Sequence, residues 1–300
     1  MTNKLRPLLA TEVKNLKDLK LPMLASVKLD GIYALIVDGI IYSRSFKPIK
    51  NKHVQKLFGN HDLNGLVGEI VCGDVYAEDV FRQTTTATMA EDGVNDVKLY
   101  VFDDWSVGDK PYQERYQHYQ RRIKALNHGS IVALEHNMLH TIDEVITALD
   151  KEQKRNGEGI ILRLPSAKWK NGRSTPKSQE SVKLKFFEQQ EYKIVDVVER
   201  MHNANEAKVN EMGYTERSSH KDNMIPMNTF GAFVMELQDG RNFNVGSGLG
   251  LTDAVRKEIW NNRDKYIGKI ATVRQMKVGS KNGIPRLPTF VGLRDNDDMS

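Results

Sequence analysis

The chain has 300 residues, of which 39% are hydrophobic and 28% are charged, and its formal net charge is +5. Such a composition is typical of a globular protein that is long enough for two domains. No stretch approaches the roughly 18 apolar residues of a membrane span, and residues 1–10 do not have the pattern of a signal peptide. Cys72 is the only cysteine. This excludes a disulfide framework and a cysteine metal site, and it favours a reducing, cytoplasmic setting.

The first part of the chain mixes strand and helix patterns without a regular βαβ rhythm. Apolar runs between turn residues predict strands, and Asp38-Gly39 between two such runs predicts a hairpin. Thr141, with Glu144 three residues later, is typical of the capping box that begins a helix. The expected strands are 24–29, 33–37, 40–43, 66–71, 98–105, 131–136, 159–164 and 181–187. The expected helices are 51–58, 81–89, 112–127 and 141–155, and a helical turn or two is expected within 11–19. This mixture favours an α+β fold with antiparallel sheets.

The character of the sequence changes after about residue 187. Short alternating strands are expected at 192–198, 230–237, 242–245, 269–277 and 290–293, with one helix at 252–261. This pattern is typical of a small Greek-key barrel such as the OB-fold. We therefore expect two domains, 1–188 and 189–300. Residues 203–228 form a long polar insertion, and loops of this length are usually functional or disordered.

One lysine has unusual surroundings. Lys28 ends an apolar run and is followed by Asp30 and Gly31, which predicts a lysine at the mouth of a sheet. Burial and neighbouring charge can lower the pKa of a lysine and make it a nucleophile. Gly31 would let the chain turn or let a ligand approach the backbone. Taken alone, this stretch is explained more simply without a catalytic role, as a hairpin corner whose lysine holds its head group in solvent.

Other polar and aromatic residues lie in or next to the expected strands, and each has a plain structural explanation by itself. A carboxylate can be a salt-bridge partner, an aromatic residue can be core, and two lysines two positions apart can share a solvent face. Taken together, they make one chemical set: a lysine nucleophile, two carboxylates for a metal ion, an aromatic platform for a base, and cations for phosphates. The residues that join Lys28 are Arg44, Glu69, Phe102, Glu158, Lys183 and Lys185.

A basic stretch covers residues 163–185, where only Glu180 is acidic. A charge run is usually a solvated face, but this one is interleaved with Trp169 and followed by Phe186 and Phe187, which favours contact with phosphate or nucleic acid. Its cations are Arg163, Lys168, Lys170, Arg173, Lys177, Lys183 and Lys185.

The order of these motifs resembles that of the covalent nucleotidyltransferases, which comprise ATP-dependent DNA ligases, RNA ligases and mRNA capping enzymes. Lys28-Leu29-Asp30-Gly31 resembles their first motif, K-x-D-G. Later motifs are resembled by Ser43-Arg44, Gly68-Glu69, and residues 101–103, 158–160 and 183–185. Residues 6–10 and 286–294 resemble the segment before the first motif and the final motif of DNA ligases. The resemblance covers essentially the whole chain and is closest to small bacteriophage-type ATP-dependent DNA ligases.

The resemblance implies an adenylation domain followed by an OB-fold β-barrel. It implies an ATP-dependent ligase that seals 5′-phosphate/3′-hydroxyl nicks in duplex DNA through a lysyl-AMP intermediate and an adenylated DNA 5′ end. The implied cofactors are ATP and Mg²⁺, with Mn²⁺ as a substitute. The implied partner is nicked double-stranded DNA, and no membrane is involved. The resemblance also implies a monomer in the cytoplasm, which would be that of the host cell if a phage encodes the protein. Roles in DNA replication, repair and recombination follow from the same resemblance.

The resemblance also implies roles for individual residues. Arg286 and Arg294 would serve the first step, and a joint near residues 188–191 would let the barrel turn afterwards. The catalytic residues would be Lys28, Asp30, Lys183 and Lys185. The nucleotide would be bound by Ser26, Val27, Lys28, Arg44, Glu69, Phe102, Arg163, Lys183, Lys185, Arg286 and Arg294, the metal ion by Glu69 and Glu158, and DNA by Arg44, Lys168, Lys170, Arg173, Lys177, Arg217 and Lys221.

The chain departs from the family pattern at two places. Tyr33 stands where the family usually has an arginine, and Asp295 is followed by Asn296 where the family often has Asp-Lys. Tyr33 leaves an RNA ligase or RNA-end repair enzyme open, although the barrel with residues 286–294 favours DNA. A capping enzyme would use GTP. From a different class, a non-catalytic nucleic-acid-binding protein would form no stable adenylate.

Overall fold

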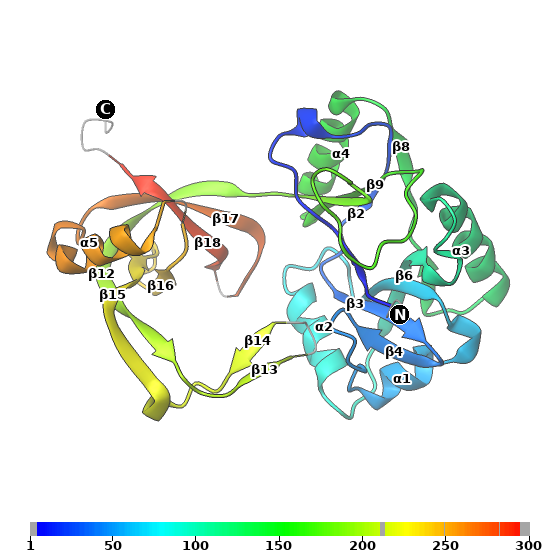
Figure 1. Ribbon diagram of the computed structural model, residues 1–300, viewed down its shortest axis with the longest axis horizontal. Helices are drawn as coiled ribbons and strands as arrows, with labels where there is room; N and C mark the ends of the chain where they lie inside the picture. The colour runs from blue at the N-terminus through cyan, green and yellow to red at the C-terminus, as the bar shows by residue number, and fades with distance from the viewer. Residues whose placement is uncertain (1–4, 211–213, 249, 282, 295–300) are drawn as a thin grey trace. The chain divides into compact units, whose positions relative to one another are not determined.

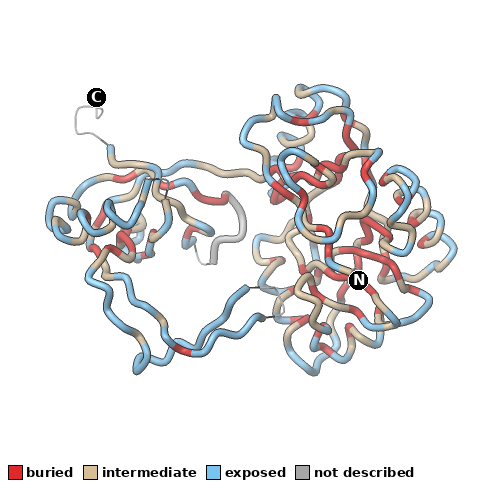
Figure 2. The backbone as a smooth tube through the Cα atoms, in the orientation of Figure 1, coloured by how far each residue is buried: buried red, intermediate tan, exposed pale blue. Residues whose placement is uncertain are grey.

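The computed structural model describes residues 5–210, 214–248, 250–281 and 283–294, and the side chains of 277–281 are not described. The chain divides into two compact units (Figure 1). The first unit comprises Met1–Lys185 with Val209–Tyr214, and the second comprises Phe186–Lys208 with Thr215–Ser300. Figure 2 shows buried segments within each unit, and the buried hydrophobic residues form separate clusters in the two units. Each unit therefore has a core of its own.

The first unit contains a five-stranded sheet of order β4-β3-β5-β6-β7. The pairs are antiparallel, except for the parallel pair β6–β7. Helices α1, α2 and α3 contact β4, β5 and β6. Apolar residues alternate along the strands, so one face meets these helices, and Phe58 and Tyr119 complete that core. The elements are β3 (Ile32–Val37), β4 (Ile40–Ser43), α1 (Lys52–Phe58), β5 (Leu66–Cys72), α2 (Val80–Met89), β6 (Val97–Asp104), α3 (Tyr112–Leu126) and β7 (Ile131–Ala133).

A second sheet of the first unit has the order β11-β9-β2-β8, and all its pairs are antiparallel. Helix α4 contacts β9. The Thr141 hydroxyl caps this helix by accepting from the Glu144 N–H (3.2 Å), but the Glu144 carboxylate accepts from the N–H of His140 (2.6 Å), one residue before the cap. The elements are β2 (Met23–Val27), β8 (Asn137–Leu139), α4 (Ile142–Lys154), β9 (Gly159–Arg163) and β11 (Ser181–Lys185), with the parallel pair β1 (Leu8–Leu9) and β10 (Gly172–Arg173).

The second unit is a five-stranded antiparallel sheet of order β16-β15-β12-β17-β18. Helix α5 contacts β15, and Phe230, Phe233 and Ile259 are among the buried residues of this core. Together with the first unit, this OB-like unit confirms the predicted α+β fold. The elements are β12 (Glu188–Asn203), β15 (Met224–Glu236), β16 (Asn242–Val245), α5 (Asp253–Asn261), β17 (Ile270–Lys281) and β18 (Ile284–Leu293).

A β-hairpin arm, whose described residues are 200–210 and 214–228, takes the place of the expected long loop. The end of β12 pairs with the start of β15, and β13 (Ala207–Val209) pairs with β14 (Thr215–Arg217). Most of the arm is exposed, as Figure 2 shows. Asn205 is the exception, because its side-chain amide donates to the carbonyls of Ser218 (3.0 Å) and His220 (3.1 Å). These bonds satisfy backbone groups that a disordered loop would leave to water.

The strand expected at 131–136 is shorter than predicted, because it ends at Ala133. Residues 11–19, where a helical turn or two was expected, contain the 3₁₀ turn Leu16–Asp18. Residues 188–191 are the start of β12 and pair with β17, so only Phe186 and Phe187 lie between β11 and β12. A joint near residues 188–191 stays a prediction. Within the described residues, no helix combines the length and the apolar character that crossing a membrane requires. The remaining 3₁₀ turns are His61–Leu63, Trp105–Val107, Lys221–Asn223 and Arg263–Lys265.

Candidate active site

A pocket of about 240 Å³ opens in the first unit between its two main sheets. Strands β2, β9 and β11 of one sheet and β3, β5 and β6 of the other contribute side chains to it. Most of the residues expected to bind ATP therefore share one cavity. The predicted residues that line it are Ser26, Val27, Lys28, Arg44, Glu69, Phe102, Arg163, Arg173, Lys183 and Lys185.

Lys28 is held where three neighbouring strands meet at one edge of their sheet. It follows β2, and its backbone N–H donates to the carbonyl of Gly159 (2.9 Å). Its Nζ donates to the carboxylate of Glu158, and the Nζ of Lys185 lies 2.7 Å from the other oxygen of that carboxylate. Gly159 makes this junction possible: its φ is +145°, and a Cβ there would lie 1.9 Å from the Leu184 carbonyl oxygen on β11.

The charge state of Lys28 depends on burial and on its charged neighbours. Burial alone would lower the pKa of this lysine, but the carboxylates of Glu158, Glu69 and Asp30 together raise it above the usual lysine value. Burial likewise favours the neutral form of Glu158, but Lys28 and Lys185 hold the pKa of Glu158 below its usual range. The neighbouring carboxylates therefore favour the charged form of Lys28, and they outweigh the lowering of the pKa that burial alone would cause.

Glu69 is the second predicted metal ligand, and its surroundings fit a cation. Burial raises its pKa, Lys28 lowers it, and the neighbouring Glu158 and Asp30 raise it again, to about 8. Carboxylates that disfavour each other's charge in a buried site are stabilised by a shared hard cation, and oxygen ligands suit Mg²⁺. Among the described residues, no cluster of three or more acidic, histidine or cysteine side chains is arranged for a metal ion. Water or phosphate oxygens would have to complete the coordination.

Aromatic side chains also line the pocket. Phe102, 9% exposed, lies on β6, and its carbonyl accepts a hydrogen bond from the Tyr112 hydroxyl (2.7 Å). The ring centroid of Tyr33 lies 5.8 Å from that of Phe102. The Tyr33 hydroxyl oxygen is buried and has no hydrogen-bond partner among the described residues. Arg163, which we expected to bind the nucleotide, is almost fully buried and lies against the Phe102 ring.

Two predicted cations at the pocket have further partners. The Nζ of Lys183 lies 3.1 Å from a carboxylate oxygen of Glu12, so Lys183 and Lys185 do not share one partner. The guanidinium of Arg44 lies 4.3 Å from the ring centroid of Tyr214, which groups with the first unit. Neither Glu12 nor Tyr214 carried a signal in the sequence that would have placed it here.

The residues expected to bind DNA have varied surroundings. Lys168 and Lys177 are exposed, as is Lys221 on the arm, while Lys170 pairs with Glu180 (3.3 Å). Arg173 donates to the carbonyl of Ala10 (2.8 Å), and Arg217 donates to the carbonyl of Asn205.

The arginines of the final motif belong to the second unit, because Arg286 lies on β18 and Arg294 follows it. Arg294 forms an ion pair with Glu191. Residues 295 and 296, where the chain departs from the family, lie outside the described residues.

Sequence reasoning missed a buried hydrogen-bond network next to Phe102. Arg115 donates to both carboxylate oxygens of Asp103 (2.7 and 3.1 Å), and these side chains are 1% and 0% exposed. His136 lies against Tyr112 (hydroxyl to Nε2, 3.0 Å), and burial lowers the pKa of His136 to about 3. One signal was available, because an acid at position 103 inside an apolar strand requires a buried cation.

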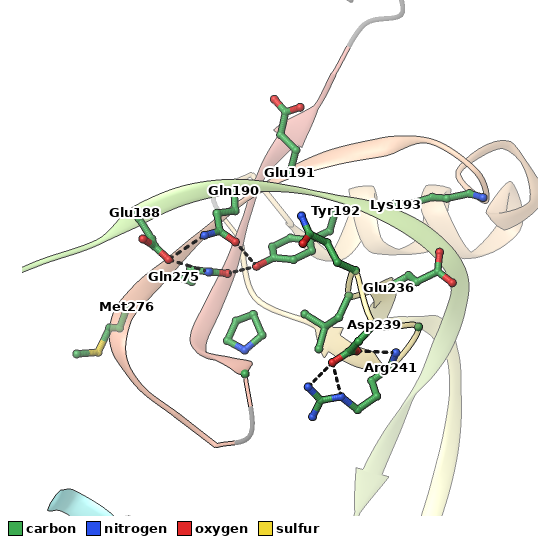
Figure 3. A pocket seen from close by; sticks show the side chains of 15 residues that line it. Glu188, Gln190, Glu191, Tyr192, Lys193, Glu236, Asp239, Arg241, Gln275 and Met276 are labelled. Atoms are coloured by element: carbon green, nitrogen blue, oxygen red, sulfur yellow. Dashed lines mark hydrogen bonds and ion pairs between the residues drawn. The ribbon is translucent and has the colours of Figure 1, made fainter. Parts of the chain in front are cut away.

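The second unit contains a separate cavity of about 870 Å³ (Figure 3). Gln190 and Gln275 both donate to Glu188, and the Tyr192 hydroxyl lies 2.7 and 2.9 Å from oxygens of the two glutamines. Arg241 is paired with Asp239 (2.5 Å). None of the predicted site residues is among its described lining residues. These polar groups satisfy one another, and we assign no chemistry to this cavity.

Solved structures of DNA ligases resemble the chain, although no curated protein sequence matches it. A crystal structure of Chlorella virus DNA ligase-adenylate is 28% identical, with a TM-score of 0.56, and the match covers 98% of this chain and 99% of that one. A structure from work on Lig E DNA ligases is 19% identical, with a TM-score of 0.69 over 96% and 99% of the two chains, and it supports the fold alone.

Two family models match the sequence directly. The model of the DNA ligase OB-like domain matches residues 226–294. The model of the ATP dependent DNA ligase domain matches residues 7–185, which is more than half of the chain. The chain therefore belongs to the family of ATP-dependent DNA ligases.

Proposed function

We propose that this ATP-dependent DNA ligase carries AMP on Lys28 and seals nicks in duplex DNA. The observation that carries the proposal is the Lys28 amine, which contacts Glu158 and lines one pocket together with Lys183, Lys185 and the aromatic ring of Phe102. That arrangement matches a nucleotide with its phosphates at the lysines and its base against Phe102. We further propose that the two domains are bounded near residue 188, as adenylation domain and OB-fold domain.

The first step joins Lys28 to the α-phosphate of ATP. The Nζ lone pair forms a bond to the α-phosphorus, the bond to the pyrophosphate oxygen breaks, and pyrophosphate leaves with that electron pair. A covalent intermediate divides a difficult transfer into easier steps. The ammonium must first transfer a proton to solvent, because the neighbouring carboxylates favour its charged form. The nitrogen loses a second proton to solvent as its bond to phosphorus forms.

Positive side chains would neutralise the phosphates during this transfer, which depends chiefly on positioning and charge. Lys185 and Lys183 line the pocket beside Lys28 and would bind the α-phosphate. Glu69 and Glu158 would hold Mg²⁺, which supplies positive charge to phosphate oxygens when bound. Arg44 would bind the ribose or the 5′-phosphate of the nick. Phe102 would stack on adenine.

The later steps act on DNA. The 5′-phosphate oxygen at the nick attacks the phosphorus of lysyl-AMP, the bond to Nζ breaks, and Nζ takes up a proton from solvent as it leaves. The 3′-hydroxyl then attacks the 5′-phosphorus and loses its proton to solvent, and the bond to AMP breaks so that AMP leaves with that electron pair. The exposed cations at 168, 177 and 221 would contact the duplex, and the arm would help to hold it. We propose a monomer that binds nicked duplex DNA in the cytoplasm.

The test is covalent labelling with α-labelled ATP. The wild-type chain should gain one AMP, located on Lys28 by mass spectrometry, and Lys28→Ala should gain none. Lys124→Ala, which changes an exposed lysine on α3, is the matched control and should label fully. Labelling of Lys28→Ala would refute the assignment.

A second experiment tests the metal site and the substrate. Glu158→Ala should lose the sealing of a nicked DNA duplex in Mg²⁺, and full activity would remove Glu158 from the site. Nicked RNA, compared with nicked DNA at equal concentrations, should be sealed more slowly by the wild type.

A further inference from the structure

The side chain of Arg163 is placed to act on the nucleotide through a neighbour. Strand β9, which carries Arg163, belongs to one sheet of the first unit, and β6, which carries Phe102, belongs to the other. The guanidinium carbon lies 4.7 Å from the Phe102 ring centroid and 5.1 Å from that of Tyr112. The arginine therefore bridges the two sheets where Phe102 lines the pocket.

The charge of Arg163 is already engaged within the protein. Its side chain is only 6% exposed, and its Nη1 lies 3.6 Å from a carboxylate oxygen of Asp103, which is fully buried. A cation this deeply buried leaves little surface for direct contact with a ligand. By contrast, a desolvated cation over an aromatic face is a strong contact, and it constrains the ring that it covers.

Contacts with Tyr112, Arg163 and Tyr33 hold Phe102. Its backbone is held by the Tyr112 hydroxyl, while its ring meets Arg163 and the tilted ring of Tyr33. A stacking platform binds a base well only if the ring is already in place, because ordering a side chain on binding reduces affinity.

We propose that Arg163 is a positioning residue for ATP: it fixes the Phe102 ring as the surface on which adenine stacks, and it does not itself contact the nucleotide. The inference rests on the proposed function, in which Phe102 binds the base. It predicts an effect on ATP affinity that disappears when the Phe102 ring is removed.

A double-mutant cycle tests this dependence. Single-turnover labelling of Lys28 gives an apparent Kd for ATP and a maximal rate for the wild type, Arg163→Met, Phe102→Leu and the double variant. Arg163→Met should raise the apparent Kd by about 3- to 10-fold, as expected for one side chain that must be ordered on binding. The maximal rate should stay within about 2-fold, because a lost ordering contact affects binding and not the transfer step. In the Phe102→Leu background, Arg163→Met should change neither value.

Two further variants distinguish the effect of the positive charge of Arg163 from an effect of impaired folding. Arg163→Lys keeps a positive charge and should raise the Kd less than Arg163→Met does. Arg121→Met removes an exposed arginine on α3 and should leave both values unchanged. Asp103 keeps both hydrogen bonds from Arg115 in every Arg163 variant, which favours folding. If Arg163→Met does not fold, Arg163→Lys is compared across the same two backgrounds.

Several results would overturn the inference. An equal rise in Kd in both backgrounds would mean that Arg163 contacts the nucleotide directly. A large fall in the maximal rate, equal losses in the Lys and Met variants, or an unchanged Kd in Arg163→Met would also contradict it. Failure of the proposed function would look different, because the wild type itself would then carry no AMP on Lys28.

Discussion

Replacing Arg115 by methionine should destabilise the first unit more than any single surface change. Arg115 is 1% exposed and donates to both oxygens of Asp103, to the Lys110 carbonyl (2.7 Å) and to the Ala167 carbonyl (2.9 Å). The variant leaves a buried carboxylate that keeps the hydrogen bond from the Asp104 N–H (2.8 Å) and the more distant Arg163, at 3.6 Å. Breaking a buried ion pair from one side costs about 3–5 kcal/mol. Because domain stabilities are only about 5–15 kcal/mol, the change removes a large fraction.

Urea unfolding of the full chain measures this loss. Trp105 and Trp169 lie in the first unit, so a Trp260→Phe background restricts the fluorescence signal to that unit. Adding Asp103→Asn to Arg115→Met should recover part of the loss, because the carboxylate charge is then gone as well. Arg121→Met should change the free energy of unfolding by less than about 0.5 kcal/mol. A loss below about 1 kcal/mol in Arg115→Met, or full additivity of the two buried changes, would refute the reasoning.

Three shorter predictions follow from the same unit. Gly159→Ala should abolish labelling of Lys28, because the new Cβ would lie 1.9 Å from the Leu184 carbonyl oxygen; normal labelling would contradict this. Tyr33→Phe should keep labelling and gain about 1 kcal/mol in urea unfolding, since it removes a buried hydroxyl without a described partner; a loss would count against it. Burial lowers the pKa of His136 in the folded protein to about 3. Between about pH 6.5 and pH 3, the unfolded chain therefore binds more protons than the folded chain does. The free energy of unfolding should fall by up to about 1.4 kcal/mol per pH unit as the pH drops through this range. His136→Gln should flatten this slope in acid titrations, and an unchanged slope would exclude the histidine.

Local chemistry made most of the secondary structure predictable from the sequence. Asp38-Gly39 predicted the hairpin between β3 and β4, and Thr141 marked the start of α4, because these signals act within a few residues. The arm could not be foreseen in the same way. Its order depends on Asn205, whose amide bonds to carbonyls 13 and 15 residues away.

The sequence alone also identified the charged residues that line the pocket, since a series of strand-end motifs in order is specific even where each motif is common. Their roles in catalysis stay predictions. What the sequence could not decide was the state of each group. The pKa of Lys28 reflects burial against three carboxylates, one of them 130 residues away, and Arg163 meets Phe102 across two sheets. Ionisation and ring packing depend on such distances, and only the tertiary structure sets them.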